Sequence, residues 1–238
     1  MCGRYAVITN PEALRALFRY FEQPNFPPRY NVAPTQPVPI VRVVEGKREF
    51  ALVRWGLIPP WVKDPRVFSL LINARGESVN EKPAFKNAMK RRRCLFPADG
   101  FYEWKAGPKP SGGGRPVKQP YFIHRLDGEP LAFAGLWETW KVPEDADPEL
   151  GGDDGWLRSC AIVTGPPNEI MVPIHNRMPV VLPESAWEQW LDPDNHDVEA
   201  LTQLLVPAPA EWFEAYAVST SVNNARTNNA ELVRAIDS

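Results

Sequence analysis

The clearest indication of the fold comes from one stretch of sequence, Cys94-Leu95-Phe96-Pro97-Ala98-Asp99-Gly100-Phe101-Tyr102-Glu103-Trp104. Two apolar, aromatic-rich segments within and just beyond it, Cys94–Phe96 and Phe101–Lys105, have the composition of short β-strands. They are separated by Pro97–Gly100. We therefore predict two strands here that are neighbours in sequence.

Segments of the same kind recur on both sides of this stretch. Further strands are predicted at Val38–Val44, Phe50–Trp55, Tyr121–Arg125, Leu131–Trp137, Leu157–Thr164 and Val180–Leu182. A first helix is predicted after Asn10, which can cap it, with Pro11 in its first turn. Its apolar side is formed by Leu14, Leu17, Phe18 and Phe21. Other helices are predicted at Pro83–Arg93, Glu184–Leu191 and Val198–Leu205.

Strands and helices that do not alternate regularly predict the α+β class with antiparallel pairing. The 238 residues, 44% of them hydrophobic, suit one compact domain. Two glycine-rich or acidic segments, Ala106–Pro120 and Val142–Gly155, are predicted to be insertions that form mobile hairpin tips. We expect the domain at 2–206, with residues 207–238 packed on it.

Composition excludes several classes of function. The formal net charge is −2, so no global basic field indicates a nucleic-acid partner, and such a partner would need a local patch. The three cysteines, Cys2, Cys94 and Cys160, are far apart and have neither a disulfide pattern nor a zinc spacing. No apolar run is long enough to span a membrane, and no signal peptide is recognisable, so a cytoplasmic protein is expected.

Cys2 has a chemical potential that an internal cysteine lacks. Removal of Met1 would leave Cys2 with a free α-amine two carbons from its thiol. The amine can condense with an aldehyde, and the thiol can then close a thiazolidine ring. An α-amine with a pKa of about 7.7–8.0 is partly neutral at pH 7. By position alone, however, a cysteine after the start codon can also be accidental.

Three polar residues lie in otherwise apolar surroundings. Asn73, followed by Arg75, comes directly after a buried-looking run and belongs either to a structural network or to a ligand site. Glu103 lies between aromatic residues and is either a solvent-facing strand residue or a general acid or base. His175 is either a satisfied core histidine or a proton shuttle.

Arginines and tryptophans near these residues suggest a single-stranded nucleic acid. Guanidinium groups bind phosphates through paired hydrogen bonds, and indole rings stack on exposed bases. The candidates are Arg4, Arg75, Arg177, Trp55, Trp61 and Trp104, and the alternative for the tryptophans is a place in the core or at an interface. No His, Cys, Asp or Glu set has metal-ligand spacing, and no glycine-rich phosphate loop follows a strand, so neither metal nor cofactor is expected.

The chain resembles the SRAP family, the SOS-response-associated peptidase-like proteins known as abasic-site DNA–protein crosslinkers. The motifs that carry the resemblance occur in the family order. They are Cys2-Gly3-Arg4, Tyr30-Asn31-Val32-Ala33-Pro34-Thr35, Trp55-Gly56-Leu57-Ile58-Pro59, Ile72-Asn73-Ala74-Arg75-Gly76-Glu77, Cys94-Leu95-Phe96-Pro97, Gly100-Phe101-Tyr102-Glu103-Trp104, Phe133-Ala134-Gly135-Leu136-Trp137-Glu138 and His175-Asn176-Arg177-Met178-Pro179.

The resemblance implies a barrel-like, mainly antiparallel core with peripheral helices and a groove for single-stranded DNA. It implies that Cys2 crosslinks to abasic sites as a thiazolidine and that the protein removes its own Met1. The same resemblance assigns Asn73 to orientation, Glu103 to acid–base chemistry and His175 to proton transfer. It further assigns Arg4, Arg75 and Arg177 to phosphates, and Trp104 and Trp61 to stacking. A monomer without cofactor is expected, nucleoid-associated if the protein is bacterial.

Two alternatives share these sequence features. In the first, Cys2 is the N-terminal nucleophile of a cysteine peptidase or amidohydrolase, with His175 or the α-amine as its base and Asn73 as an oxyanion donor. In the second, the chain is a non-catalytic module that binds single strands through arginines and tryptophans.

Overall fold

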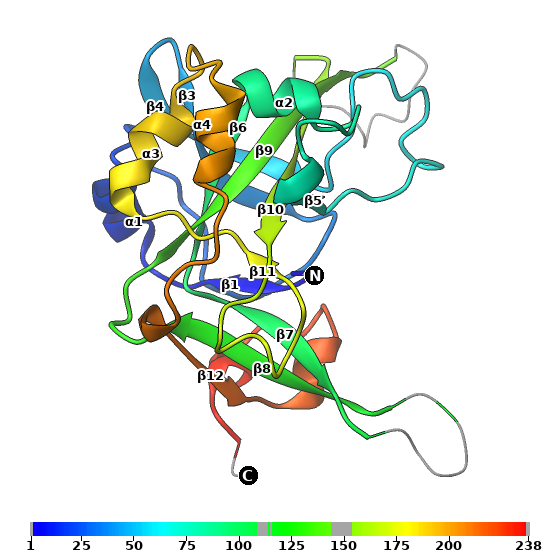
Figure 1. Ribbon diagram of the computed structural model, residues 1–238, viewed down its shortest axis with the longest axis vertical. Coiled ribbons are helices and arrows are strands. Elements are labelled where there is room, and N and C mark those ends of the chain that lie inside the picture. The colour runs from blue at the N-terminus through cyan, green and yellow to red at the C-terminus, as the bar shows by residue number, and fades with distance from the viewer. Residues whose placement is uncertain (1, 109–113, 115, 144–153, 237–238) are drawn as a thin grey trace.

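A computed structural model describes residues 2–108, 114, 116–143 and 154–236. Its larger sheet closes into a five-stranded barrel. The barrel strands are β3 (Pro37–Val44), β4 (Lys47–Trp55), β6 (Arg93–Ala98), β9 (Leu131–Lys141) and β10 (Trp156–Gly165). All neighbours are antiparallel except β4 and β10, whose parallel pairing closes the barrel (Figure 1).

A second, antiparallel sheet lies against one end of the barrel (Figure 1). Its strands, in order, are β12 (Phe213–Ala217), β8 (Lys118–Arg125), β7 (Gly100–Ala106), β1 (Tyr5–Val7) and β2 (Arg29–Val32). Only Asp99 separates the end of β6 in the barrel from the start of β7 in this sheet. The N-terminal strand β1 therefore lies where the two sheets meet.

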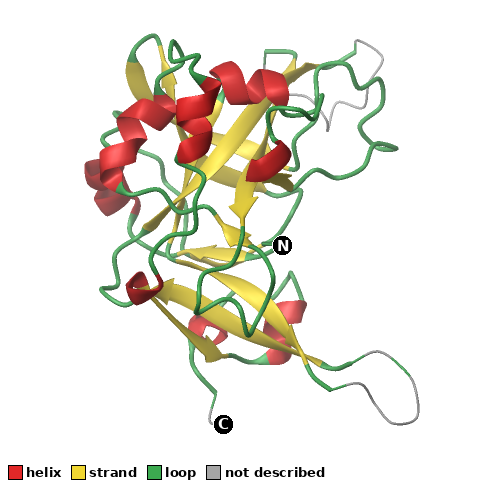
Figure 2. Ribbon diagram, viewed as in Figure 1, coloured by secondary structure: helices red, strands yellow, loops and turns green. Residues whose placement is uncertain are grey.

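Helices cover the outside of the barrel (Figure 2). They are α1 (Pro11–Phe18), α2 (Lys86–Arg91), α3 (Glu184–Leu191) and α4 (Val198–Gln203), with short 3-10 turns η1 (Gly76–Ser78), η3 (Ala210–Trp212), η4 (Thr220–Asn223) and η5 (Ala230–Val233). Asn10 caps α1 as predicted, because its side-chain oxygen accepts from the backbone N–H of Glu12 at 2.8 Å. The helix ends earlier than Phe21, since Arg19 adopts a left-handed conformation with φ 59°.

The core is aromatic and fully buried where the two sheets meet. The Tyr5 ring contacts Trp55 and Phe133 edge to face, with centroids 5.4 and 6.1 Å apart. Phe101 makes a similar contact with Phe133 at 5.9 Å. These rings belong to β1, β4, β7 and β9, so one cluster joins the barrel to the second sheet and fixes β1 between them.

The predicted fold class, a single domain with a barrel-like antiparallel core and peripheral helices, is confirmed. Some elements differ in position. The helix predicted at Pro83–Arg93 starts only at Lys86, and the strand predicted at Val180–Leu182 is β11 at Met178–Pro179. Four short strands, β1, β2, β5 (Asn73–Arg75) and β12, were not predicted.

Each of the two predicted insertions lies between two paired strands, the first between β7 and β8 and the second between β9 and β10. The Gly107 N–H donates to the Val117 carbonyl at 2.8 Å, and the Val142 N–H donates to the Gly155 carbonyl at 3.0 Å. The tips themselves, residues 109–113, 115 and 144–153, lie outside the described residues. After residue 206 the chain adds β12 to the second sheet through pairing with β8.

Candidate active site

Cys2 is fully buried at the start of the chain segment that leads into β1. Its Sγ lies 3.7 Å from the Arg4 carbonyl oxygen, which also accepts from the Tyr102 N–H at 3.0 Å. Burial raises the pKa of the Cys2 thiol well above its usual value, and the nearby charge of Glu103 raises it further. The thiol is therefore held in its protonated form.

Asn73 fixes the backbone of Cys2. It belongs to β5, which pairs in parallel with β10 so that Asn73 lies opposite Ile162. Its Nδ2 donates to the Cys2 carbonyl at 2.9 Å. Its Oδ1 is buried and has no hydrogen-bond partner among the residues that the structure describes. The amide thus anchors the N-terminal segment and leaves an acceptor unsatisfied beside it.

Glu103 approaches the site from β7 and is 2% exposed. The pairing of Tyr5 with Phe101 sets β7 beside β1, which brings Glu103 close enough for its charge to act on the Cys2 thiol. Burial raises the pKa of Glu103, and the neighbouring His175 opposes that shift. The carboxyl is thus suited to hold a proton that an exposed glutamate would lose.

His175 is half-buried in the loop before β11. The backbone N–H of Arg177 donates to its Nδ1 at 3.1 Å. The Arg177 carbonyl oxygen lies 3.3 Å from the same Nδ1, so the backbone of Arg177 holds the ring in place in either tautomer. Cys2, Asn73, Glu103 and His175, which are spread over more than 170 residues of sequence, are therefore brought together.

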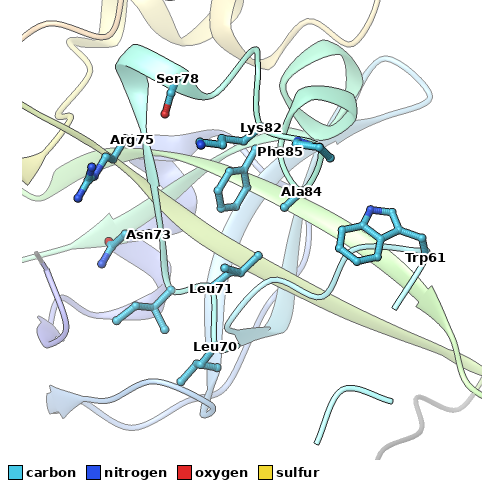
Figure 3. Close-up of a pocket in the computed structure, with 11 residues that line it drawn as sticks. Trp61, Leu70, Leu71, Asn73, Arg75, Ser78, Lys82, Ala84 and Phe85 are labelled. Carbon is cyan, nitrogen blue, oxygen red and sulfur yellow. The ribbon is translucent and has the colours of Figure 1, made fainter. Parts of the chain in front are cut away.

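Two cavities flank this group. One, of about 550 Å³, is lined by Glu103, Trp104, Val117, Lys118, His175, Thr220 and Asn223. The other, of about 520 Å³, is lined by Trp61, Leu70, Leu71, Ile72, Asn73, Arg75, Ser78, Lys82, Pro83, Ala84 and Phe85 (Figure 3). Since Glu103 borders one and Asn73 the other, the reactive group lies between two open spaces.

The three predicted phosphate contacts are not equivalent in the structure. Arg4 is bonded inside the protein, where its Nη1 donates to Asn31 Oδ1 at 2.9 Å and to the Val222 carbonyl at 2.7 Å. Arg177 pairs with Glu77, with an Nη2–Oε2 distance of 2.8 Å, and lowers the pKa of that carboxyl. Arg75 is exposed and borders the Asn73 cavity, and its charge also lowers the pKa of Glu77.

The two predicted stacking residues lie in different cavities. Trp104 follows Glu103 on β7, and its Nε1 donates to Asn223 Oδ1 at 2.8 Å. Trp61 is 58% exposed at the rim of the other cavity, where its ring meets Phe68 edge to face at 5.5 Å. Figure 3 shows Trp61 on the side of that cavity opposite Arg75.

Residues near the C-terminus were missed as contributors to the site. Thr220 and Asn223 of η4 line the Glu103 cavity, and Asn31 holds this turn in place by donating to the Val222 carbonyl at 3.2 Å. Asn31 belongs to one of the family motifs, but no local pattern in the sequence pairs it with Val222, which is 191 positions away.

Neither a metal centre nor a membrane span is seen in the described part of the chain. Among residues 2–108, 114, 116–143 and 154–236, no three His, Cys, Asp or Glu side chains are arranged to hold a metal ion. None of the helices described there combines the length and the apolar character needed to cross a bilayer.

Comparison with known proteins identifies the family. The chain is 38% identical over 237 residues to the abasic site processing protein YoqW of Bacillus subtilis, covering 98% of this chain and 99% of that protein. It is 31% identical over 245 residues to the abasic site processing protein YedK of Escherichia coli, covering 99% and 100%. A crystal structure of a Bacteroides thetaiotaomicron protein, 24% identical, shows the same fold with a TM-score of 0.80 over 99% of this chain and 100% of that one. The family model for SOS response associated peptidases (SRAP) matches residues 1–225. The chain therefore belongs to the SRAP family.

Proposed function

We propose that this protein processes abasic sites in single-stranded DNA by forming a covalent thiazolidine between the site and Cys2. The observation that carries the proposal is the grouping at Cys2 of an amide bonded to its carbonyl and a buried carboxyl near its thiol, with a histidine near that carboxyl. Relatives named abasic site processing proteins, aligned over nearly the whole chain, support the choice of substrate.

The first step needs a free α-amine, so Met1 must be removed. We propose that the protein hydrolyses the Met1–Cys2 bond itself, with the same acid–base groups that later serve the sugar. The neutral amine then adds to the aldehyde carbon of the ring-opened deoxyribose and gives a carbinolamine. Asn73 fixes the approach because its Nδ2 holds the Cys2 carbonyl at 2.9 Å.

Dehydration and ring closure follow. Glu103, whose pKa is raised by burial, donates a proton to the carbinolamine hydroxyl, and water leaves to give an imine. The thiol adds to the imine carbon while its proton passes to the nitrogen, so the net change is the loss of one water. His175, which borders the same cavity as Glu103, relays protons in both directions. Closure traps the imine and so suppresses β-elimination.

The two cavities suit a single strand that crosses the Cys2 site. Arg75 borders one cavity and can meet a phosphate, while Trp61 and Trp104 can stack on flanking bases. Arg4 and Arg177 stay in the proposal as phosphate contacts that would exchange or share their present hydrogen bonds. Because such contacts do not read the bases, the protein should bind single strands with little base preference. Its affinity for DNA should fall steeply as the salt concentration rises. We propose a cytoplasmic monomer that acts without cofactor.

The alternative, a cysteine hydrolase, is less well supported. A nucleophilic cysteine works as a thiolate and needs a lowered pKa. Here burial and the charge of Glu103 both raise the pKa of the Cys2 thiol. A thiol that adds to an imine can pass its proton to nitrogen in the same step, so the thiazolidine mechanism does not need a free thiolate.

A gel experiment tests the proposal. The Met1-processed protein is mixed with a single-stranded oligonucleotide that carries one abasic site, and the products are separated on a denaturing gel. A heat-stable shifted band is expected, and the matched duplex should give much less. Hydrolysis of peptides in trans without any DNA adduct would favour the hydrolase instead.

Two controls separate the amine from the thiol. Cys2→Ser should form an imine that borohydride traps but no durable band without it. A chain with an extra residue between Met1 and Cys2 keeps the thiol but lacks its adjacent amine. A durable adduct from that chain would contradict the amine-first mechanism.

A further inference from the structure

We infer that Lys118, together with Asn223, forms a phosphate-binding subsite on the Glu103 side of the reactive centre. The inference rests on the proposed function, because it takes the ligand to be the phosphodiester next to an abasic sugar. It assigns that phosphate to β8 and to the C-terminal turn η4.

The need for such a subsite comes from the distribution of charge. A strand that passes the Cys2 site leaves one phosphate on each side of the abasic sugar. On the Asn73 side, Arg75 and Lys82 line the cavity. On the Glu103 side, the guanidinium of Arg4 is already bonded to Asn31 and Val222. The guanidinium of Arg177 is bonded to Glu77 and Thr164, next to β5, and does not line the Glu103 cavity.

Lys118 fills this gap. It lines the same cavity as Glu103 and His175 and is exposed on β8, beside the last residue of β7. Within the described residues its ammonium has no carboxylate or carbonyl partner. An exposed ammonium that lines the same cavity as the reactive carboxyl can receive an anion from outside the protein.

Two polar residues complete the subsite. Trp104 Nε1 donates to Asn223 Oδ1 at 2.8 Å, which fixes the amide so that Nδ2 remains as a donor. Thr220, three residues earlier in η4, adds a hydroxyl to the same cavity. The lining thus offers an ammonium, an amide N–H and a hydroxyl, which are groups that bind phosphate oxygens. The Trp104–Asn223 bond would also couple the ring to the bound phosphate.

The test measures binding apart from chemistry. Affinity is determined for a single-stranded oligonucleotide with a tetrahydrofuran abasic analogue, which cannot form an imine, over a range of salt concentrations. Lys118→Ala should weaken binding about fivefold, as an exposed ion pair does. The slope of log affinity against log salt should become about 0.7 less steep, as for one lost contact to a single strand.

Three further variants sharpen the result. Asn223→Asp keeps an oxygen for Trp104 but replaces the donor with a negative charge, so it should weaken binding more than Lys118→Ala. Lys47→Ala removes the same charge from the start of β4, away from both cavities, and should change nothing. Lys118→Arg should restore binding.

An uncharged methylphosphonate locates the contact. It replaces the phosphate on one side of the analogue and then on the other. At one of the two positions it should weaken binding to the wild type but add no loss to Lys118→Ala. Additive losses at both positions, or an unchanged salt slope, would overturn the inference. A wild type that binds the analogue but forms no adduct with a true abasic site would instead count against the proposed function.

Discussion

Glu103 and Asn73 are buried polar groups that the fold alone does not need. A buried carboxyl costs free energy when it is ionised, and an amide oxygen without a partner loses its hydration. Both costs fall beside Cys2, and ionisable groups shifted by burial are typical of reactive sites. The sequence showed that Glu103 lay among aromatic residues but left open whether it was buried.

Glu103→Gln should stabilise the folded protein at neutral pH. The folded state raises the pKa of Glu103, so between the unfolded value of about 4.3 and the raised value it binds more protons than the unfolded chain. Stability contributed by this group therefore falls as pH rises through that window, and the glutamine avoids the loss. Urea unfolding at pH 3.5 and pH 7.5 checks this, because the gain should appear only at the higher pH. An equal gain at both would show that ionisation is not the cause.

The same variant should slow adduct formation by about 100-fold or more, as expected for a lost general acid. The wild-type rate should rise with pH as the amine loses its proton. It should fall again at higher pH as Glu103 loses the proton that it donates. In Glu103→Gln the falling limb should disappear. Single-turnover rates measured from pH 5 to 9 decide, and a falling limb retained in the variant would exclude Glu103 as the acid.

Asn73→Ala should lower the adduct rate because the Cys2 carbonyl loses the N–H that holds it. Misplacement of a reacting group by about 1 Å can cost about 100-fold in rate. The matched control is Asn80→Ala, which also removes a side-chain hydrogen bond, to Thr202, outside the site. We expect Asn80→Ala to react at the wild-type rate. Equal losses in both variants would point to a general effect on stability.

The long strands and the capped helix could be predicted from local pattern, but the short strands could not. Strand β5 has three residues, and β1 has three. Such segments are too short to show alternation, and their pairing depends on partners far away, β10 for β5 and β2 and β7 for β1. These two strands carry Asn73 and position Cys2, so the geometry of the site was set by the elements that sequence reasoning missed.

Gly135→Ala tests how closely the barrel strands pack. A Cβ at this position of β9 would overlap with the Phe96 ring and lie 2.9 Å from Cys94 Sγ, both on β6. We expect a loss of about 1–3 kcal/mol in the free energy of unfolding, as for overpacked cores. Gly165→Ala is the control, since its Cβ would meet Val180 Cγ2 at 3.4 Å. Thermal unfolding of both variants should show a lower Tm only for Gly135→Ala, and similar Tm values would contradict the packing argument.

The complete fold joins the two ends of the chain at the site. Asn31 Nδ2 donates to the carbonyls of Val222, Asn224 and Thr227 at 3.0–3.2 Å, and Asn31 Oδ1 accepts from Arg4. This network ties the segment that holds Cys2 to the turn that walls the Glu103 cavity. Asn31 and Arg4 both belong to family motifs in the sequence. Their common partner, the Val222 carbonyl, is known only from the folded chain.

Asn31→Ala should loosen the C-terminal segment without melting the barrel. Three carbonyls lose their hydrogen bond from Asn31, so the backbone around residues 220–228 should exchange its amide hydrogens faster. The barrel strands β3, β4 and β9 should keep their protection. Hydrogen exchange followed by mass spectrometry separates the two regions. A uniform increase over the whole chain would show that Asn31 supports global stability instead.

The account depends on bond formation between a sugar carbon and both the nitrogen and the sulfur of Cys2. Peptide mass spectrometry of the purified adduct tests this most directly. The N-terminal peptide should lack Met1, should carry the sugar remnant at Cys2 with the loss of one water, and should resist alkylation of its thiol. An adduct located on a lysine, or one that retains Met1, would contradict the account.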